Sequence, residues 1–118
     1  MEEIAGVGID VVDVSVMAGA RYKTRLAEYF LTKSERALVP QNTKTAEYLA
    51  SRFAAKEAVI KAFPKKLSPH EFSILKKGVR PIVVFRSKKY TDAYTVHLSL
   101  SHTALTAAAI AILTTSPT

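Results

Sequence analysis

The chain has 118 residues and no cysteine, which excludes disulfides, zinc–thiolate sites and thiol nucleophiles. Hydrophobic residues make up 48% of it, so we expect one folded domain spanning residues 1–118. Its formal net charge of +7 indicates an anionic partner: nucleic acid, a membrane surface, an acidic protein or a phosphorylated small molecule.

The sequence also predicts the cellular compartment of the protein. The first residues, Met-Glu-Glu, lack the basic region and hydrophobic core of a secretory signal. No apolar run approaches the roughly 18–20 residues of a membrane span, and the longest, 107–113, has the length of a strand. Because an absence of cysteine also fits a reducing compartment, we expect a cytoplasmic protein.

Residues 4–14 are rich in valine and isoleucine and predict a β-strand. Its alternation sorts the side chains onto two faces, Val7, Ile9 and Val11 on one and Gly8, Asp10 and Val12 on the other. A carboxylate in such an apolar strand either turns the chain or belongs to a site. Gly6 and Gly8 do not form a dinucleotide phosphate loop, because that loop lies between a strand and a helix.

Residues 15–31 predict a helical segment with an irregularity at Gly19. The next four residues, Thr32-Lys-Ser-Glu35, have the form of a capping box, which predicts a short helix that Pro40 closes. The basic residues of the first segment are most simply a solvated face: Arg21, Lys23 and Arg25.

The stretch 52–63 predicts a helix that begins near Thr43 or Thr45, with a threonine oxygen as its cap, and ends before Pro64. Its core-facing stripe contains Glu57 among apolar residues, namely Ala46, Leu49, Ala50, Phe53 and Ile60. The other faces of its second half are also apolar, so we expect the helix to be buried nearly all round. Glu57 can pair with Lys61 one turn on, yet a carboxylate in an apolar stripe indicates a stronger partner, such as a metal ion.

After Pro64 the pattern changes to strands. We expect strands at 71–77, 82–85, 94–101 and 107–113, and a polar connection or short helix at 87–93. The turn from Lys77 to Pro81 contains Gly78, which can take a positive φ. His102 is either a turn residue or a site residue. Ser101 beside it is no evidence for a serine nucleophile, because adjacent strand residues point to opposite faces.

Asp10 and Glu57 are the two acids that structure alone explains least well. If they converge, they form a hard-oxygen site for Mg²⁺, which typically binds one or two carboxylates, waters and substrate phosphates. Lys61 could hold a phosphate of the same substrate. Further anion contacts could come from Arg52, Lys56 and His102. These residues predict magnesium-assisted transfer at a phosphate ester.

Two other functions use parts of this pattern. A non-catalytic module that binds RNA or DNA phosphates would explain the charge, but Asp10 and Glu57 would repel phosphates unless a metal intervened. A magnesium-dependent phosphohydrolase would use the same two acids, with water in place of a protein acceptor.

The residues resemble a known family, the holo-[acyl-carrier-protein] synthases among the bacterial 4′-phosphopantetheinyl transferases. Three segments are similar to its motifs: Gly8-Ile-Asp-Val11, Arg52-Phe-Ala-Ala-Lys-Glu-Ala-Val-Ile-Lys-Ala62 and Leu98-Ser-Leu-Ser-His-Thr103. The turn from Lys77 to Pro81 looks like the family's G-[KR]-P turn with one inserted residue. The motifs occur in the family's order and span nearly the whole chain, and the central one is the most specific.

The resemblance implies an α+β fold, with a mostly antiparallel sheet packed against one long central helix. It implies a Mg²⁺-dependent transfer of the 4′-phosphopantetheine group from coenzyme A to a serine of apo-acyl carrier protein in fatty-acid biosynthesis, with release of adenosine 3′,5′-bisphosphate. It also implies a homotrimer with active sites between subunits. The acidic carrier protein complements the charge of +7, so we expect neither nucleic acid nor a membrane as partner.

The resemblance assigns roles residue by residue. Asp10 and Glu57 would be the magnesium ligands and, with Lys61, the catalytic residues. Lys61 would lie at the coenzyme A pyrophosphate and take part in proton transfer. Contacts to the nucleotide end would come from Arg52, His102 and Thr103.

Arg21 and Arg25 would be carrier-docking residues under the same resemblance. The chain departs from the family shortly after the first motif, where an arginine is usual. Ser15 or Val16 stands in its place.

Overall fold

The strands form two antiparallel sheets in the computed structural model, which describes residues 2–116 apart from the side chains of 20–24. One sheet has three strands in the order β1-β5-β4, namely β1 (Ile4–Asp13), β5 (Thr106–Thr115) and β4 (Tyr94–His102). The other is the hairpin of β2 (Phe72–Lys77) and β3 (Arg80–Phe85). Gly78 in its turn has φ +64°, as the sequence predicted.

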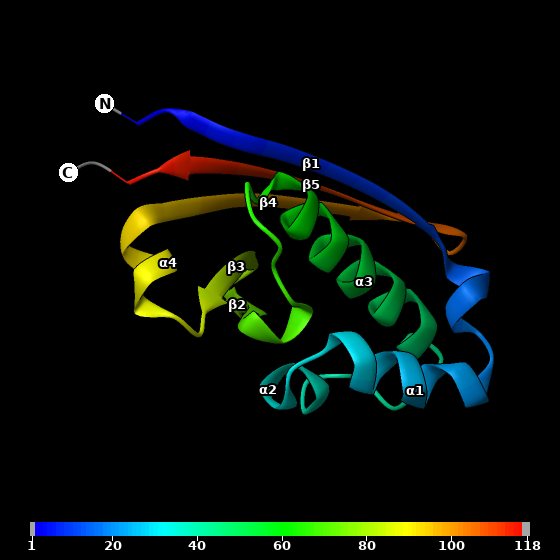
Figure 1. Ribbon diagram of the computed structural model, residues 1–118. Coiled ribbons are helices and arrows are strands. Elements are labelled where there is room, and N and C mark those ends of the chain that lie inside the picture. Colours follow the sequence, from blue (N-terminus) through cyan, green and yellow to red (C-terminus); the bar gives the residue numbers. More distant parts are fainter. Residues whose placement is uncertain (1, 117–118) are drawn as a thin grey trace.

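The helices lie on one side of the three-stranded sheet. They are the 3-10 helices Val14–Met17 and Pro69–Glu71, and the α-helices α1 (Ala20–Phe30), α2 (Lys33–Arg36), α3 (Thr45–Ala62) and α4 (Lys88–Ala93). The sheet packs directly against α3, α1 and α2 lie on the far side of α3, and the hairpin lies beside α3 with β3 next to β4 (Figure 1). This arrangement confirms the expected α+β fold with one long central helix.

Local signals at the helix ends were partly right. The capping box is present, because the Thr32 hydroxyl accepts from the Glu35 amide and the Glu35 carboxylate accepts from the Thr32 amide. The start of α3 at Thr45 also agrees with the prediction. The predicted threonine cap is wrong, since Lys44 is the N-cap residue and the Thr45 hydroxyl donates to the carbonyls of Pro40 and Asn42.

Helix α3 and strand β1 approach so closely that only glycine fits at two positions of β1. A Cβ atom at Gly8 would lie 1.9 Å from the carbonyl oxygen of Ala58, and one at Gly6 would lie 1.8 Å from that of Ala62. Both glycines therefore serve packing between helix and strand, which agrees with the rejection of a phosphate loop. This close approach brings the backbone of β1 next to the last turns of α3.

The second half of α3 is apolar and buried, as expected, but a different charged residue is buried there. Lys56 is fully buried, whereas Glu57 is half-buried and Lys61 is exposed. Lys56 forms an ion pair of 2.7 Å with Glu35, so the expectation that it contacts a bound anion is wrong. The Glu57–Lys61 pair is also absent from the described residues, because Lys61 contacts Asp10 instead.

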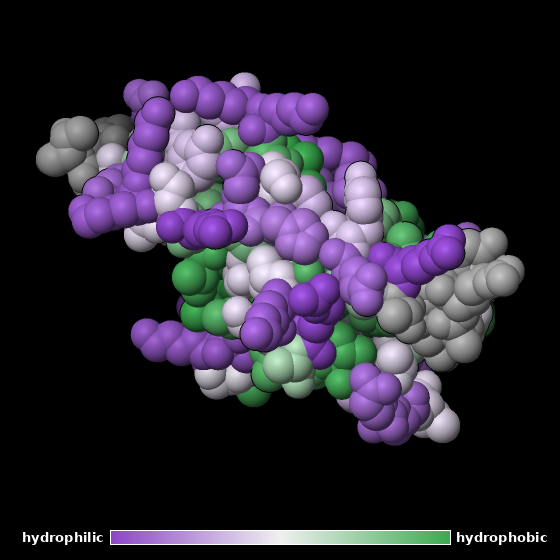
Figure 2. Space-filling model, turned by 60° about the horizontal axis from the view of Figure 1, so that its bottom comes forward, coloured by the Kyte–Doolittle hydropathy of each residue, from purple (hydrophilic) through white to green (hydrophobic). Residues whose placement is uncertain are grey.

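The outer face of the three-stranded sheet carries exposed apolar side chains. Val7, Ile9 and Val11 are 55%, 62% and 63% exposed, while Gly8 and Val12 are buried against α3. The alternation predicted from the sequence is thus confirmed. By contrast, the side formed by α1 and α2 is mainly hydrophilic, with smaller hydrophobic patches between the polar side chains (Figure 2). No helix in the described part of the chain is long and apolar enough to cross a membrane.

Candidate active site

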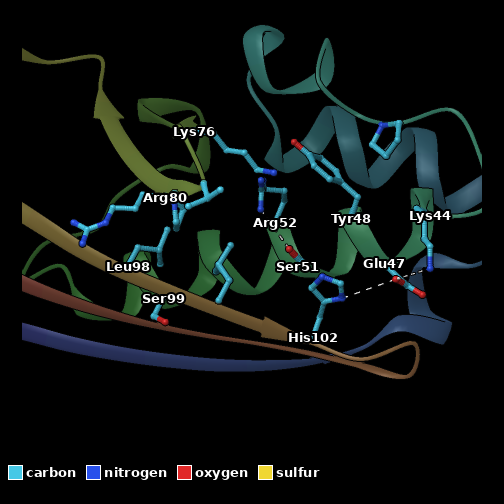
Figure 3. Close-up of a pocket in the computed structure, with 14 residues that line it drawn as sticks. Lys44, Glu47, Tyr48, Ser51, Arg52, Lys76, Arg80, Leu98, Ser99 and His102 are labelled. Atoms are coloured by element: carbon cyan, nitrogen blue, oxygen red, sulfur yellow. Dashed lines mark hydrogen bonds and ion pairs between the residues drawn. The ribbon is translucent and has the colours of Figure 1, made fainter.

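A cavity of about 630 Å³ lies between α3, β4 and the β2–β3 hairpin. Five of its lining residues are basic or can become so, namely Lys44, Arg52, Lys76, Arg80 and His102, and Glu47 is the single acidic one. Figure 3 shows Arg52 and Tyr48 projecting from α3, Lys76 and Arg80 from the hairpin, and His102 from the end of β4. Such a cavity suits a ligand with several negative charges.

Arg52 is the most unusual side chain of this cavity. It is only 4% exposed, and no carboxylate pairs with it among the described residues. Its Nε atom is buried without a hydrogen-bond partner, while Nη1 is 3.4 Å from the Ser51 hydroxyl and the guanidinium lies 4.6 Å from the centroid of the Tyr48 ring. A buried charge without a counter-ion is costly, so this geometry favours an anionic ligand beside Arg52.

His102 and Lys44 flank Glu47 at one end of the cavity. The Oε2 atom of Glu47 is 3.9 Å from Nδ1 of His102 and 3.7 Å from Nζ of Lys44. The sheet register places His102 opposite Ala107, which in turn lies opposite Val12. Since directly opposed residues share a face and Val12 is buried, His102 projects from the face of the sheet that meets α3.

Asp10 lies on the same face of the sheet as His102, two rows away. It is opposite Ala109, which is opposite Leu100 of the cavity wall. Its Oδ1 atom is 3.0 Å from Nζ of Lys61, which also donates to the Ile9 carbonyl at 3.1 Å. The Asp10 side chain is 16% exposed and that of Lys61 52% exposed, so the contact is open to solvent on the lysine side.

The two predicted magnesium ligands come from neighbouring elements. Asp10 is on β1 and contacts Lys61, and Glu57 lies one helical turn before Lys61 on α3. The described residues contain no group of three or more His, Cys, Asp or Glu side chains that could hold a metal ion by themselves. Two carboxylates nevertheless fit Mg²⁺, because this ion is usually bound through one or two carboxylates with substrate phosphates and water.

The predicted site residues and the residues that line this cavity overlap only in part. Thr103 is not among the residues that line the cavity, and its hydroxyl accepts from the amides of Leu105 and Thr106 in the β4–β5 turn. Arg25 is exposed on α1, whereas the Arg21 side chain lies outside the described residues. Four lining residues were missed as site residues: Lys44, Tyr48, Lys76 and Arg80. For the three basic residues the available signal was charge, which the sequence shows at many positions, and Tyr48 gave no signal.

Comparison with known proteins agrees with the geometry. The family model of the 4′-phosphopantetheinyl transferase superfamily matches residues 6–113. The chain belongs to this superfamily. Within the superfamily it is similar to a holo-[acyl-carrier-protein] synthase of Beutenbergia cavernae, with 40% identity over 118 residues that cover 92% of this chain and 97% of the relative. By family, the chain is a phosphopantetheinyl transferase.

Solved structures of the superfamily have the same fold. A holo-(acyl-carrier-protein) synthase from Bacillus anthracis, in complex with CoA (3′,5′-ADP), superimposes with a TM-score of 0.82 and 28% identity, covering 96% of this chain and 98% of that one. The synthase from Helicobacter pylori, in complex with coenzyme A, gives a TM-score of 0.75 and 28% identity, with coverages of 91% and 98%.

Proposed function

We propose that this chain, as one domain over residues 1–118, transfers the 4′-phosphopantetheine group of coenzyme A to a serine of apo-acyl carrier protein. The observation that carries the proposal is Arg52, a buried guanidinium in the wall of a basic cavity, for which the described residues supply no acidic partner. The nucleotide end of coenzyme A is a polyanion that would supply the missing negative charge. The complexes of the Bacillus anthracis and Helicobacter pylori relatives with coenzyme A support this choice of ligand.

The nucleotide would bind in this cavity. Arg52 and His102 would contact its phosphates from α3 and β4, and Lys76 and Arg80 would add positive charge from the hairpin. A planar guanidinium suits a phosphate because it can donate two parallel hydrogen bonds. Thr103, next to His102, is proposed as a further contact at the nucleotide end, and its hydroxyl also accepts from the amides of Leu105 and Thr106.

Asp10 and Glu57 would hold Mg²⁺ beside the coenzyme A pyrophosphate. When bound, the ion would neutralise phosphate charge and make the phosphorus more electrophilic. Lys61 would turn from Asp10 to the pyrophosphate and hold the bridging oxygen. A new bond forms between the carrier serine oxygen and the phosphorus of the phosphopantetheine group as the bond to the bridging oxygen breaks. Adenosine 3′,5′-bisphosphate leaves with the bridging oxygen, the serine proton passes to water, and Lys61 would take part in this proton transfer.

The carrier protein would dock near α1. The net charge of +7 complements an acidic partner and would speed its association. Arg25 is exposed on α1 and is available for such a contact. Arg21 is proposed for the same role on the family resemblance.

The apolar outer face of the sheet would pack against further copies of the chain to give a homotrimer. This face, defined by Val7, Ile9, Val11 and Ile110, exposes large aliphatic side chains on two adjacent strands, and Ile9 lies opposite Ile110. A contiguous exposed apolar patch typically marks an interface. In light scattering, Ile9→Lys should lower the measured mass to that of a monomer, whereas Val84→Lys, at an exposed valine of the hairpin, should not. A wild-type protein that is itself monomeric would contradict the trimer.

The observation on Arg52 can be tested by equilibrium binding of adenosine 3′,5′-bisphosphate. Arg52→Met should weaken binding by about 100-fold or more, in the range for losing a bidentate contact between charged groups. Arg36→Met, which removes an exposed arginine of α2, loses the same net charge and should bind nearly as the wild type. Because Arg52 is buried and no carboxylate of the described part of the chain pairs with it, Arg52→Met should not destabilise the ligand-free protein. Equal affinities for the two variants would remove Arg52 from the site.

The two alternative functions, a phosphohydrolase and a nucleic-acid-binding module, predict different experimental results. A phosphohydrolase would break down coenzyme A with Mg²⁺ and no acceptor protein. A nucleic-acid module would retain RNA or DNA with a strong salt dependence and would not bind coenzyme A. Membership of the transferase superfamily favours neither.

A further inference from the structure

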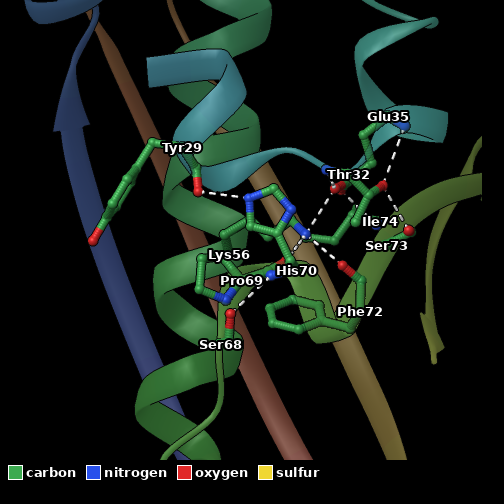
Figure 4. A network of polar contacts seen from close by, with 10 residues as sticks. All are labelled: Tyr29, Thr32, Glu35, Lys56, Ser68, Pro69, His70, Phe72, Ser73 and Ile74. Carbon is green, nitrogen blue, oxygen red and sulfur yellow. Dashed lines mark hydrogen bonds and ion pairs between the residues drawn. The ribbon is translucent and has the colours of Figure 1, made fainter. Parts of the chain in front are cut away.

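The outer edge of β2 pairs with two buried side chains in place of a strand. The Ile74 amide donates to Oε2 of Glu35 at 2.7 Å, and Lys56 Nζ donates to the carbonyl of Phe72. The carbonyl of Phe72 and the amide of Ile74 both point away from β3, because the backbone groups of alternate residues in an antiparallel strand point to the same side. Glu35 and Lys56 therefore supply the acceptor and the donor that a third strand of the hairpin sheet would supply (Figure 4).

The ion pair between Glu35 and Lys56 is completely enclosed. The Lys56 side chain is 0% exposed and that of Glu35 1%, with 2.7 Å between Nζ and Oε1. The three N–H groups of Lys56 have three acceptors, Glu35 Oε1, the Pro69 carbonyl at 2.6 Å and the Phe72 carbonyl. Glu35 Oε1 also accepts from the Thr32 amide at 2.8 Å. A pair so fully bonded permits one arrangement of the segments that it joins.

These segments carry the two facing walls of the cavity. Lys56 follows Arg52 by one turn of α3, and Ile74 precedes Lys76 by two residues of β2. Both Arg52 and Lys76 line the cavity, as does Arg80 just past the hairpin turn. The hairpin belongs to a sheet of its own, so no strand pairing fixes its distance from α3. Apolar side chains of similar volume would often stabilise such an interior as well or better, so stability alone does not account for the pair.

We propose that Lys56 and Glu35 are positioning residues that set the distance between the hairpin and α3, and thereby the affinity for the nucleotide end of coenzyme A. Neither residue touches the ligand. The inference rests on the proposed function, in which this cavity holds the nucleotide. It assigns to the buried lysine of the central motif a role in binding and none in the chemical step.

The test compares Glu35→Gln with Leu113→Ala at a temperature where both variants are folded. Leu113 is a buried residue of β5, a strand that pairs with β1 and β4 and not with β2. Glu35→Gln should raise the Kd of adenosine 3′,5′-bisphosphate and the KM of coenzyme A about tenfold, as expected for one or two charge-assisted hydrogen bonds. Its kcat at saturating coenzyme A should stay within about twofold of the wild type. Amides of residues 76–80 should exchange faster with solvent. Leu113→Ala should change neither the Kd nor this exchange.

Glu35→Gln/Lys56→Met provides a second variant if Glu35→Gln does not fold. It removes both charges of the pair, so no unpaired ion stays buried, and it should raise the same Kd about tenfold. An unchanged Kd in the folded variant, or an equal rise in Leu113→Ala, would overturn the positioning role alone. If the wild type itself does not bind adenosine 3′,5′-bisphosphate, the proposed function fails, and this inference fails with it.

Discussion

The ammonium group of Lys61 lies 3.0 Å from the Asp10 carboxylate and not beside Glu57 on its own helix. This contact joins the end of α3 to the middle of β1. The ammonium group neutralises one of the two carboxylates proposed to bind Mg²⁺. On binding of metal and coenzyme A, the lysine would be displaced to a phosphate, so one residue would serve two successive anions.

Lys61→Ala should therefore reduce the rate more than the stability. We expect kcat to fall by about 100-fold, as for the loss of one group that stabilises charge in the transition state. The free energy of unfolding should change by no more than about 1 kcal/mol, because a half-exposed ion pair contributes little. Lys66→Ala, at an exposed lysine just beyond α3, is the matched control and should retain full activity. Unchanged turnover in Lys61→Ala would remove this residue from the mechanism.

Asp10→Asn and Glu57→Gln should each abolish the activation of transfer by Mg²⁺. Both substitutions preserve size and remove one of the two negative charges that attract the ion. Titrations of activity with Mg²⁺ would show the loss, and circular dichroism would show that the fold is intact. Asp13→Asn, at an exposed acid of the same strand, should leave the Mg²⁺ dependence unchanged. Activation that survives in Glu57→Gln would show that the proposed metal role is wrong.

Regular patterns in the sequence predicted the fold well. The alternation around Asp10 identified the inner and outer faces of β1, and the capping box located α2. The central helix was harder, because a helix that is apolar on several faces has no single buried stripe. Its one-dimensional pattern singled out Glu57 as the buried charge, although the fold buries Lys56. The partner that makes this burial possible, Glu35, lies in another helix, and no local pattern links the two.

Gly8→Ala should destabilise the protein strongly. The new Cβ would lie 1.9 Å from the Ala58 carbonyl oxygen, so α3 and β1 would have to separate. We expect a loss of about 3 kcal/mol in the free energy of unfolding, at the upper end for overpacking. Gly78→Ala is the control, since its Cβ would meet no atom within 4 Å and only the positive φ opposes it, at about 1 kcal/mol. Urea denaturation that ranks the two variants in the opposite order would contradict the close approach.

Burial lowers the pKa of Lys56 from its ordinary value of 10.5, and the neighbouring Glu35 carboxylate offsets only part of this effect. Between the lowered pKa and 10.5, the unfolded chain binds a proton that the folded chain does not. The free energy of unfolding should therefore rise with pH across this alkaline interval. The double variant Glu35→Gln/Lys56→Met has no titrating group at either position and should lack this contribution. Denaturation at increasing pH measures this change. If the free energy of unfolding rose with the same slope in the wild type and the double variant, the prediction would be contradicted.

The sequence singled out candidate site residues only where residue types conflicted with their surroundings. Asp10, Glu57 and Lys61 attracted attention because charges are unusual in apolar segments. Lys76 and Arg80 gave no such signal, since they are exposed basic residues of a hairpin like many others in the chain. They belong to the cavity only because the hairpin folds against α3, which depends on contacts between residues far apart in sequence.

The central claim is that this chain moves phosphopantetheine from coenzyme A to a protein. Intact-mass spectrometry of an apo-acyl carrier protein, incubated with the chain, coenzyme A and Mg²⁺, tests it most directly. We predict that the carrier gains the mass of one phosphopantetheine group and that adenosine 3′,5′-bisphosphate appears in equal amount. No gain with any of several acidic carrier proteins, from wild-type chain that is folded and binds coenzyme A, would contradict the claim.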